Sequence, residues 1–363
     1  MVDVRMWRVP GRVNLIGEHL DYNGGPCLPF AIDRGLTVKG RVRDDDLVNV
    51  WSDGRKASFP LTTKPGDVDG WAAHVAGTVW VLADDGRAMR GADIVIESDL
   101  SAGAGLSSSA ALTCGVACTL DDLAGLGLSR LDVARVSQRV ENEVIGAPTG
   151  LMDQLAVLNG REGHVLAVEA LADPPGVREI ALPVDDAALG LLVIATGVIH
   201  QHADSGYATR REECEQAAAE LGLELLAQAG PDAVLRLDDE RLKARTRHVI
   251  TETARVRGAI RAIEAGAWTQ LGTMLTASHA SLRDDFEVSC AELDVAVEAA
   301  VEAGALGARM TGGGFGGSAV ALVPHDRVDA VRELVEQRFD GGGWRKPDIF
   351  AVRASDGAAL VRN

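Results

Sequence analysis

A glycine- and serine-rich stretch at residues 100–111, Leu-Ser-Ala-Gly-Ala-Gly-Leu-Ser-Ser-Ser-Ala-Ala, limits the possible folds more than any other part of the sequence. Gly103 and Gly105 allow positive φ angles and a close approach of the backbone to a ligand. The residues that follow, 110–120, have the apolar spacing of an amphipathic helix. Because the first amides of a helix lack partners and its dipole favours negative charge, we predict a turn that binds phosphate. The three serine hydroxyls add donors and oxygen ligands for a hard cation.

This stretch departs from the common phosphate-binding motifs. No Lys follows the glycines, as G-x-x-x-x-G-K-[ST] requires, and Ser108 stands where G-x-G-x-x-G needs its third glycine. A G-x-S-x-G element is absent from the sequence, which argues against a hydrolase serine. An alternative is that the serines only cap a helix, because Ser is a favoured N-cap residue. The stretch alone leaves both interpretations open.

Length and charge narrow the possible classes of protein. At 363 residues the chain is longer than one core usually serves, so we expect two domains. The net charge of −17 argues against binding to nucleic acid or to anionic membranes, and it requires a local positive site for any phosphate substrate.

Hydropathy and cysteine content indicate where such a chain works. The first ten residues lack the apolar core of a signal peptide, and the longest apolar run, 188–199, is too short to span a bilayer. Five cysteines without a C-x-x-C pair are typical of a reducing compartment. We therefore expect a cytoplasmic protein with no membrane partner.

A second informative stretch lies near the N-terminus, at residues 7–25. We predict a short strand over 12–16, followed by Gly17 and a polar cluster of Glu18, His19 and Asp21. In an extended chain Glu18 would face away from His19 and Asp21, so the chain must kink if all three are to meet one ligand. Carboxylates and an imidazole near an arginine suit an array of sugar hydroxyls. The alternative is a solvated loop.

Three motifs, in this order, resemble those of the galactokinases. These kinases belong to the larger group named for galactose, homoserine, mevalonate and phosphomevalonate kinases. The motifs are residues 11–23 (GRVNLIGEHLDYN), 103–111 (GAGLSSSAA) and 310–317 (MTGGGFGG), and the resemblance covers most of residues 8–325. It implies an α+β fold of two domains, a small-molecule kinase fold with the active site in the cleft between them. It also implies ATP-dependent phosphorylation of galactose at the anomeric hydroxyl, giving galactose 1-phosphate and ADP.

The resemblance also assigns site residues by their positions in this sequence. The residues that it implies for holding galactose are Arg12, Glu18, His19, Asp21, Gly150, Asp153 and Tyr207, with Glu18 and His19 on the hydroxyl farthest from the anomeric carbon. Those that it implies for ATP are Gly103, Ala104, Gly105, Leu106, Ser107, Ser108, Ser109 and Trp71. Ser109 and Glu141 match ligands of Mg²⁺, and Asp153 and Arg12 match the catalytic pair.

Elementary chemistry agrees with these implied roles. An arginine beside Asp153 would lower the pKa of that carboxyl, so we expect an ionised but weakly basic group. We predict that Asp153 orients the anomeric hydroxyl and accepts its proton late, while Arg12 stabilises charge on the transferred group. Because the glycine stretch offers no Lys, we expect Mg²⁺ to be indispensable.

Helix signals place some of these residues. Ser129 and Asp132 form a capping pair before a helix whose apolar residues are Val133, Val136, Val140 and Val144. Glu141 lies beside that apolar stripe near the helix end, where the alternative is a solvated glutamate. The near-helical spacing of Ile250, Ala254, Arg257 and Ile260 predicts a helix over 246–264.

A break in the sequence near residue 174 gives the expected domain division. Two prolines and a glycine at 174–176 place the first domain at 1–180 and the second at 181–363. The last strand, which we predict at 349–352, is a candidate to pack back on the first domain. We expect the glycine motif at 311–317 to approach the active site through its backbone, although a plain hairpin is the alternative.

Departures from the family pattern leave alternative functions open. Leu20 stands where the family usually has Thr; strand alternation points it away from His19, which indicates a packing role. Two histidines, at 200 and 202, give half a metal site with no third ligand at a usual spacing. The alternatives to a galactokinase are a kinase of a related sugar and a sugar sensor without activity. We expect galactose and ATP as the partners of a monomer.

Overall fold

A computed structural model describes residues 4–100, 103–199 and 203–361. Its larger sheet has six strands in the order β12-β1-β2-β5-β3-β4, all antiparallel to their neighbours except β3 and β5. The strands are β1 (Arg5–Asn14), β2 (Pro29–Val42), β3 (Leu47–Ser52), β4 (Arg55–Pro60), β5 (Ala92–Ser98) and β12 (Ala359–Leu360).

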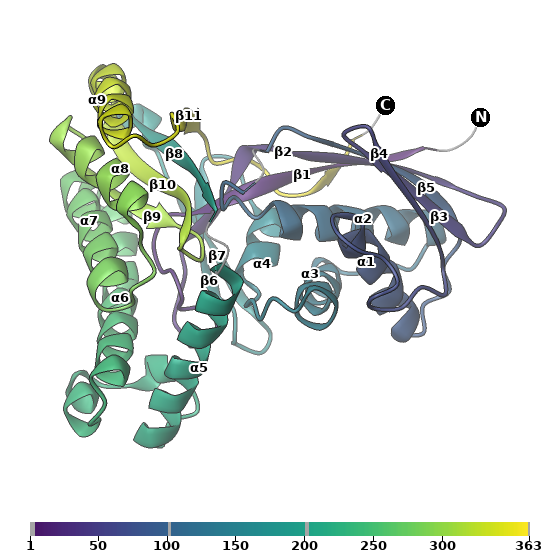
Figure 1. Ribbon diagram of the computed structural model, residues 1–363, viewed down its shortest axis with the longest axis horizontal. Coiled ribbons are helices and arrows are strands. Elements are labelled where there is room, and N and C mark those ends of the chain that lie inside the picture. The colour runs from purple at the N-terminus through teal and green to yellow at the C-terminus, as the bar shows by residue number, and fades with distance from the viewer. Residues whose placement is uncertain (1–3, 101–102, 200–202, 362–363) are drawn as a thin grey trace.

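Helices cover one face of this sheet, as Figure 1 shows. They are α1 (Ala72–Asp84), α2 (Ser108–Ala124), α3 (Arg130–Arg139), a π-helical turn (Val140–Ile145) and α4 (Met152–Asn159). The apolar faces of α1 and α2 bury Val75 and Val116 against strand residues such as Val38 and Ile94, so the amphipathic pattern of each element meets in one core.

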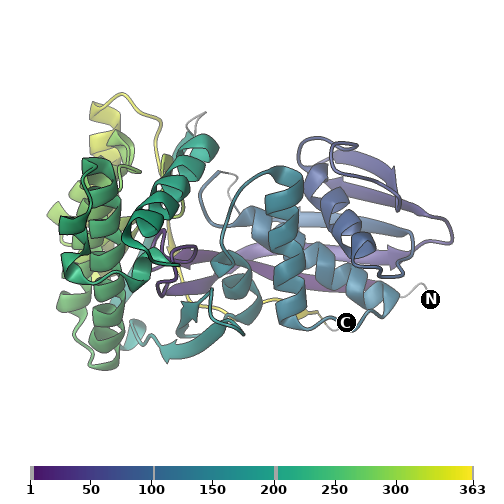
Figure 2. The same ribbon diagram turned by 90° about the horizontal axis from the view of Figure 1, so that it is seen from below.

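A second sheet, of four antiparallel strands in the order β11-β8-β10-β9, lies at the other end of the molecule (Figure 2). Its strands are β8 (Leu189–Ile199), β9 (Gly307–Thr311), β10 (Gly316–Pro324) and β11 (Asp348–Val352). The helices of this end are α5 (Ala203–Leu221), α6 (Glu240–Glu264), α7 (Trp268–Asp284), α8 (Ala291–Glu302) and α9 (Val328–Gly341). A hairpin of β6 (His164–Glu169) and β7 (Gly176–Ala181) lies between the two ends.

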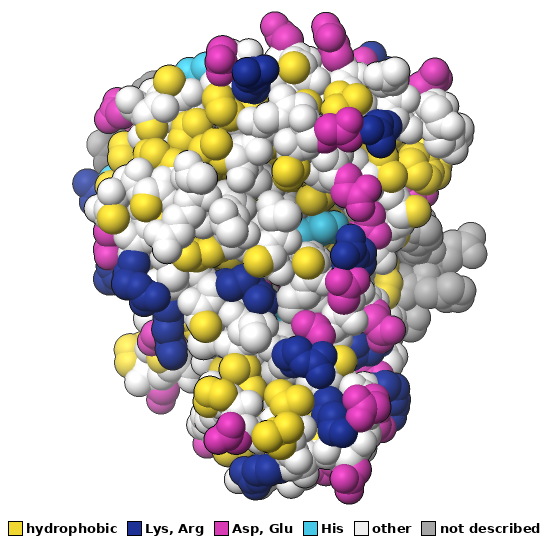
Figure 3. Space-filling view, turned by 90° about the vertical axis from the view of Figure 1, so that its left-hand side faces the viewer, with side chains coloured by type: hydrophobic (Ala, Val, Ile, Leu, Met, Phe, Trp, Pro, Cys, Tyr) yellow, Lys and Arg dark blue, Asp and Glu magenta, His cyan; other side chains and the backbone are white. Residues whose placement is uncertain are grey.

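The surface over this helical end carries many charged side chains with hydrophobic ones between them (Figure 3). Acidic and basic side chains are interspersed on the face that Figure 3 shows, with ion pairs such as Arg338–Glu302 at 2.6 Å and Arg283–Asp284 at 2.8 Å. In the described part of the chain, none of the helices has both the length and the apolar character that crossing a membrane requires.

Apolar side chains of residues 13–32 pack in the core of the second sheet, although β1 and β2, at the two ends of this stretch, belong to the first sheet. Val13, Leu15 and Leu20 belong to the same hydrophobic cluster as Val193 of β8 and Phe286 after α7. The polar stretch at 17–21 therefore lies where the two halves of the molecule meet.

Several sequence predictions are confirmed and others need correction. The helix after the serines is α2, and Ser129 and Asp132 form the predicted capping box of α3. The predicted strand at 12–16 is partly wrong, because β1 ends at Asn14.

The predicted helix at 246–264 is α6, which begins earlier, at Glu240, because the Asp239 side chain caps it. The residues whose spacing predicted this helix do not form its buried face. Ala254 and Arg257 are exposed, whereas His248 and Glu252 are fully buried.

The two last strands take different partners. β11, the strand expected at 349–352, pairs with β8 in the second sheet. β12 pairs with β1, with Trp7 opposite Leu360, and Ile32 forms an isolated bridge with Ala354. The segment after β11 thus returns to the edge of the first sheet (Figure 1).

Candidate active site

A cavity of about 200 Å³ lies between the two halves of the molecule. Four segments line it: the end of β1 with the turn after it, the loop 147–153 into α4, the start of α5, and the glycines after β9. The lining residues are Arg12, Glu18, His19, Asp21, Ala147, Pro148, Thr149, Gly150, Met152, Asp153, Tyr207, Gly312, Gly313 and Gly314. All seven residues that the resemblance assigns to the sugar are among them.

Residues 17–21, which we call the acidic turn, are sharply kinked. Gly17 has φ +104° and His19 has φ +61°. This confirms the expected kink, and it brings the side chains of Glu18, His19 and Asp21 to one cavity. Leu20 is fully buried in the hydrophobic cluster and does not line the cavity, in agreement with a packing role.

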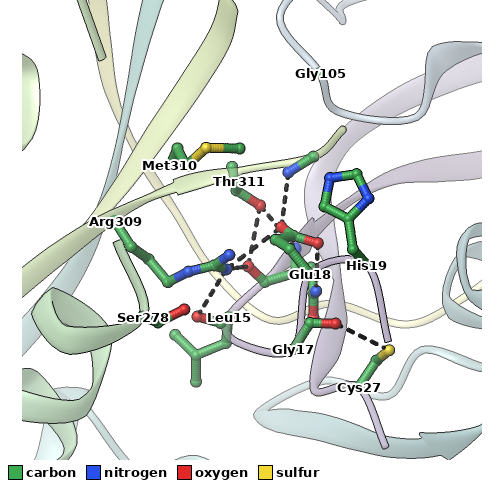
Figure 4. A network of polar contacts seen from close by, with 12 residues as sticks. Leu15, Gly17, Glu18, His19, Cys27, Gly105, Ser278, Arg309, Met310 and Thr311 are labelled. Carbon is green, nitrogen blue, oxygen red and sulfur yellow. Dashed lines mark hydrogen bonds and ion pairs between the residues drawn. The ribbon is translucent and has the colours of Figure 1, made fainter. Parts of the chain in front are cut away.

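The Glu18 carboxylate is held by three protein donors. Its Oε2 accepts a hydrogen bond from Asn14 Nδ2 at 2.7 Å, and its Oε1 accepts one from the Gly312 amide at 2.7 Å. The guanidinium of Arg309 on β9 is 3.3 Å from Oε1 (Figure 4). Because each carboxylate oxygen offers about two acceptor positions, Oε2 retains one for a ligand hydroxyl.

Sequence reasoning missed Arg309. Its side chain is fully buried, and its guanidinium also donates to the carbonyls of Asn14 and Leu15 at 3.1 and 3.3 Å. The one available signal was an arginine within the short strand Gly307–Thr311, which is otherwise built of residues that a core accommodates.

The His19 imidazole is fixed in position and uncharged. Burial lowers the pKa of this ring to about 3. Nε2 lies 3.1 Å from the Gly313 carbonyl, and Nδ1 lies 2.9 Å from the Tyr22 hydroxyl. A neutral ring satisfies both contacts when Nε2–H donates to the carbonyl and Nδ1 accepts from the tyrosine. The ring of Tyr207, from α5, lies 5.1 Å away, centroid to centroid.

Asp21 and Gly150 touch across the cavity. A Cβ atom added at Gly150 would lie 1.9 Å from Asp21 Oδ2, so only glycine fits there. Burial, and after it the negative charges of Asp153 and Glu18, raise the pKa of the Asp21 carboxyl to about 7.

Asp153, at the start of α4, forms a two-point ion pair with Arg12. Arg12 Nε lies 2.8 Å from Oδ1, and Nη2 lies 3.1 Å from Oδ2. The third nitrogen of the guanidinium donates to the Gly105 carbonyl at 2.6 Å, and the Ser107 hydroxyl donates to Asp153 Oδ2. This arrangement joins the carboxylate directly to the glycine- and serine-rich stretch.

Residues 103–109, which we call the serine turn, lead into α2. Ser107 occupies the N-cap position with φ +55°, but its hydroxyl bonds Asp153, and among the described residues no side chain caps α2. The interpretation that these serines only cap the helix is therefore wrong. The first amides of α2 remain available to an anion.

Ser109 and Glu141 form a second polar pair. Ser109 Oγ donates to Glu141 Oε1 at 2.8 Å, while Thr149 and Gln154 donate to Oε2 at 2.7 and 3.1 Å. Glu141 is 4% exposed on the π-helical turn, so the alternative of a solvated glutamate is wrong. Burial raises the pKa of its carboxyl.

This pair has the oxygen chemistry that suits Mg²⁺, which usually takes one or two protein ligands and completes its shell with water and phosphate. Within the described ranges, no cluster of three or more His, Cys, Asp or Glu side chains could hold a metal ion. The half metal site at 200 and 202 lies outside the described residues.

The glycine motif approaches the serine turn through its backbone. A Cβ at Gly312 would meet the Gly105 carbonyl oxygen at 3.3 Å, and one at Gly317 would meet Gly105 Cα at 3.7 Å. Ser318 Oγ donates to the Ala104 carbonyl at 2.6 Å. These contacts agree with the backbone role expected for the motif.

Trp71 is the one assigned residue that lies apart from these contacts in the described structure. It is half-buried at the start of α1, with the Arg55 guanidinium 5.1 Å from its ring centroid. It does not line the cavity. Its part in binding adenine stays a prediction.

Comparison with known proteins gives three matching sequence families and close full-length relatives. The families are the galactokinase galactose-binding signature over residues 2–42, the GHMP kinases N terminal domain over 73–161 and the GHMP kinases C terminal domain over 259–341. The chain is 43% identical to a galactokinase from Streptomyces coelicolor, with 97% of this chain and 93% of the relative covered. It is 42% identical to a galactokinase from Mycobacterium tuberculosis, with 97% and 98% covered.

A solved structure gives the same result for the fold. The galactokinase of Lactococcus lactis in complex with galactose superposes with a TM-score of 0.92 at 32% identity, covering 99% of this chain and 95% of that one. The α+β kinase fold expected from the sequence is confirmed.

Proposed function

The chain belongs to the galactokinase family of GHMP kinases, and we propose that it transfers the terminal phosphoryl group of ATP to the anomeric hydroxyl of galactose. The products are galactose 1-phosphate and ADP. The observation that carries the proposal is the position of Asp153. Its carboxylate lines the cavity with the acidic turn and is bonded to Ser107 of the serine turn and to Arg12.

We assign the sugar to the cavity side of the acidic turn. Glu18 Oε2 accepts one sugar hydroxyl hydrogen, Asp21 contacts a neighbouring hydroxyl, and Tyr207 covers the ring from α5. The His19 ring, whose two nitrogens are bonded to Gly313 and Tyr22, packs beside the hydroxyl that Glu18 accepts. Fixed acceptors in a buried cavity discriminate strongly against a sugar that lacks the matching hydroxyl, because the protein groups are then left unpaired.

Asp153 orients the anomeric hydroxyl and accepts its proton as the phosphoryl group is transferred. Arg12 holds the carboxylate at two points and places positive charge beside the reacting groups. The amides at the start of α2 bind the phosphates of ATP, and Trp71 contacts the adenine.

Ser109 and Glu141 are the residues that would hold Mg²⁺. When bound there, the ion would neutralise phosphate charge for which the serine turn provides no lysine. We also propose a cytoplasmic location, which agrees with the five free cysteines. The expectation of a monomer stays a prediction.

The test is a direct assay of product. The purified chain is incubated with galactose, ATP and MgCl₂, and phosphorus NMR follows the formation of an anomeric sugar phosphate together with ADP. We expect stoichiometric amounts of both, and none without Mg²⁺. ATP that remains intact while galactose binds would identify a sensor. Faster turnover of an N-acetylated, 6-deoxy or pentose sugar would identify a kinase of a different sugar.

A further inference from the structure

Two side chains of α6 contact the backbone of the acidic turn from the side away from the cavity. Glu252 Oε1 accepts a hydrogen bond from the Gly17 amide at 3.0 Å. His248 Nε2 lies 3.2 Å from the Glu18 carbonyl oxygen. The two residues are one helical turn apart, so both lie on the same face of α6. Between them they hold both ends of the Gly17–Glu18 unit, one through its donor and the other through its acceptor.

Helix α7 supports both contacts. Ser278 Oγ donates to Glu252 Oε1 at 2.6 Å, and Ser281 Oγ lies 3.0 Å from His248 Nδ1. Arg255 Nε pairs with Glu252 Oε2 at 2.6 Å. Burial lowers the pKa of His248 to about 4, so the neutral ring donates from Nε2 to the Glu18 carbonyl and leaves Nδ1 as an acceptor. The one hydrogen of the Ser281 hydroxyl is shared between this Nδ1, at 3.0 Å, and Asp285 Oδ2, at 3.1 Å.

The burial of these groups argues against an incidental arrangement. His248, Glu252 and Ser278 are all fully buried. A buried carboxylate is costly unless it is paired, and replacing such a network with apolar residues is often neutral for stability. A buried polar network fixes the position of the groups that it contacts. Here those groups are the backbone amide of Gly17 and the backbone carbonyl of Glu18, in the acidic turn.

The acidic turn needs such support because its backbone is strained. A positive φ at a residue other than glycine costs about 1–3 kcal/mol and persists only where the surroundings fix it. His19 has φ +61° and follows directly after the Gly17–Glu18 unit. Figure 4 shows Glu18 pointing from this strained backbone toward Arg309 and Thr311, with the His19 ring on the side away from Arg309. A shift of the turn moves both sugar-binding side chains together.

We infer that His248 and Glu252 are positioning residues for sugar recognition: they set the place of Glu18 and His19 without touching the substrate. This inference rests on the proposed function. It predicts that loss of a contact from α6 weakens binding of galactose and recognition of the hydroxyl that faces Glu18 and His19. Binding of ATP at the serine turn is unaffected.

The experiment compares two substitutions at one position. His248→Leu keeps apolar volume against Phe286 but removes the donor to Glu18, whereas His248→Gln keeps a donor at similar reach. The matched control is Thr246→Val on the same helix, whose buried hydroxyl has no hydrogen-bond partner among the described residues. For each variant we measure KM for galactose and for ATP, kcat/KM for galactose and for 6-deoxygalactose, and Tm.

For His248→Leu we expect KM for galactose to rise about tenfold, the effect of one hydrogen bond, with KM for ATP unchanged. The ratio of kcat/KM between galactose and 6-deoxygalactose falls, because the 6-hydroxyl loses its aligned acceptor, Glu18 Oε2. His248→Gln restores most of the affinity for galactose and most of the ratio between the two sugars. Thr246→Val leaves KM for galactose and this ratio unchanged. Equal losses on the two sugars with an unchanged ratio would show a purely structural role and would overturn the inference.

A second measurement does not depend on turnover. Hydrogen exchange of the Gly17 amide is expected to be faster in Glu252→Ala, which removes its acceptor, and in Ser278→Ala, the milder variant that serves if the first does not fold. Exchange equal to wild type in the folded variant would overturn the inference even if the chain phosphorylates galactose. A wild-type chain that leaves galactose unphosphorylated would instead overturn the proposed function, while the exchange result still tests whether α6 holds the acidic turn.

Discussion

Glu18 enters the cavity with three protein donors already bound to its carboxylate, whereas Ser107 directs its hydroxyl to Asp153 and leaves the first amides of α2 without a side-chain cap in the described structure. The acidic turn is thus preorganised by the protein, whereas under the proposed function the nucleotide would complete the serine turn. This difference fits two kinds of substrate. Fixed hydrogen-bond acceptors select a neutral sugar. For a highly charged nucleotide, the phosphate charges themselves provide much of the free energy of binding.

The largest effect is expected where the two turns meet. Asp153→Asn removes the charge that pairs with Arg12 and the acceptor for the sugar proton. We expect kcat to fall by about 10²- to 10⁴-fold, the usual contribution of a positioned base. Steady-state rates with galactose and ATP measure this, with Tm as the control for folding. A wild-type rate would remove Asp153 from the mechanism.

On the sugar side, Gly150→Ala places a methyl group against Asp21 Oδ2, where the added Cβ would lie 1.9 Å away. Overpacking costs about 1–3 kcal/mol, which corresponds to a roughly 5- to 150-fold rise in KM for galactose. KM for ATP stays unchanged. Gly230→Ala, at a glycine with φ −80° whose added Cβ meets nothing within 4 Å, is the control for an added methyl group that meets no neighbour. An equal rise in both KM values would contradict the division into two sides.

On the phosphate side, Ser109→Ala removes the hydroxyl that bonds Glu141. We expect the Mg²⁺ concentration for half-maximal rate to rise about tenfold, the effect of one hydrogen bond to a charged group, with KM for galactose unchanged. Titration of MgCl₂ at fixed ATP measures it. Ser108→Ala, at the neighbouring hydroxyl, is the comparison variant. An unchanged Mg²⁺ requirement in Ser109→Ala would argue against this ligand assignment.

The smallest effect concerns pH. The raised pKa of Asp21, about 7, means that protons compete with sugar hydroxyls for this carboxylate. KM for galactose should therefore rise about fourfold from pH 8 to pH 6.5, and Asp21→Asn should remove this dependence.

The same shift has an opposite consequence for stability. Between the ordinary pKa of an Asp and pH 7, the folded chain holds a proton at Asp21 that the unfolded chain has released, so the free energy of unfolding falls as pH rises. Asp21→Asn should therefore have a higher Tm than wild type at pH 8. A lower Tm would contradict this sign.

Local parts of the structure were predictable because neighbouring residues decide them. The Ser129 capping box follows from capping chemistry, and the presence of α2 follows from its apolar periodicity, although α2 begins at Ser108 without a side-chain cap among the described residues. The pairing of Arg12 with Asp153, 141 residues apart, was available only through the family resemblance, since nothing local connects the two.

The support behind the acidic turn was not predictable. On α6 the helix was expected, but its buried face is partly polar, with Glu252 and His248 in the positions of core residues. Apolar periodicity assigns polar residues to the surface, and it has no means of recognising a charge that a distant turn and a second helix satisfy. Arg309 was not predicted as a site residue for the same reason, because it is a buried charge whose partners are distant in the sequence.

The pairing of β12 with β1 sets an order of events during synthesis. The edge strand β1 cannot pair with β12 until residues 359–360 have been synthesised. The bridge to Ile32 likewise cannot form before Ala354 has been synthesised. A ribosome that has completed the first half of the chain has therefore not yet produced the segment that closes that half. This edge of the N-terminal sheet stays open until residues 359–360 have been synthesised, and a nascent chain stalled before that point presents an unpaired strand to its neighbours.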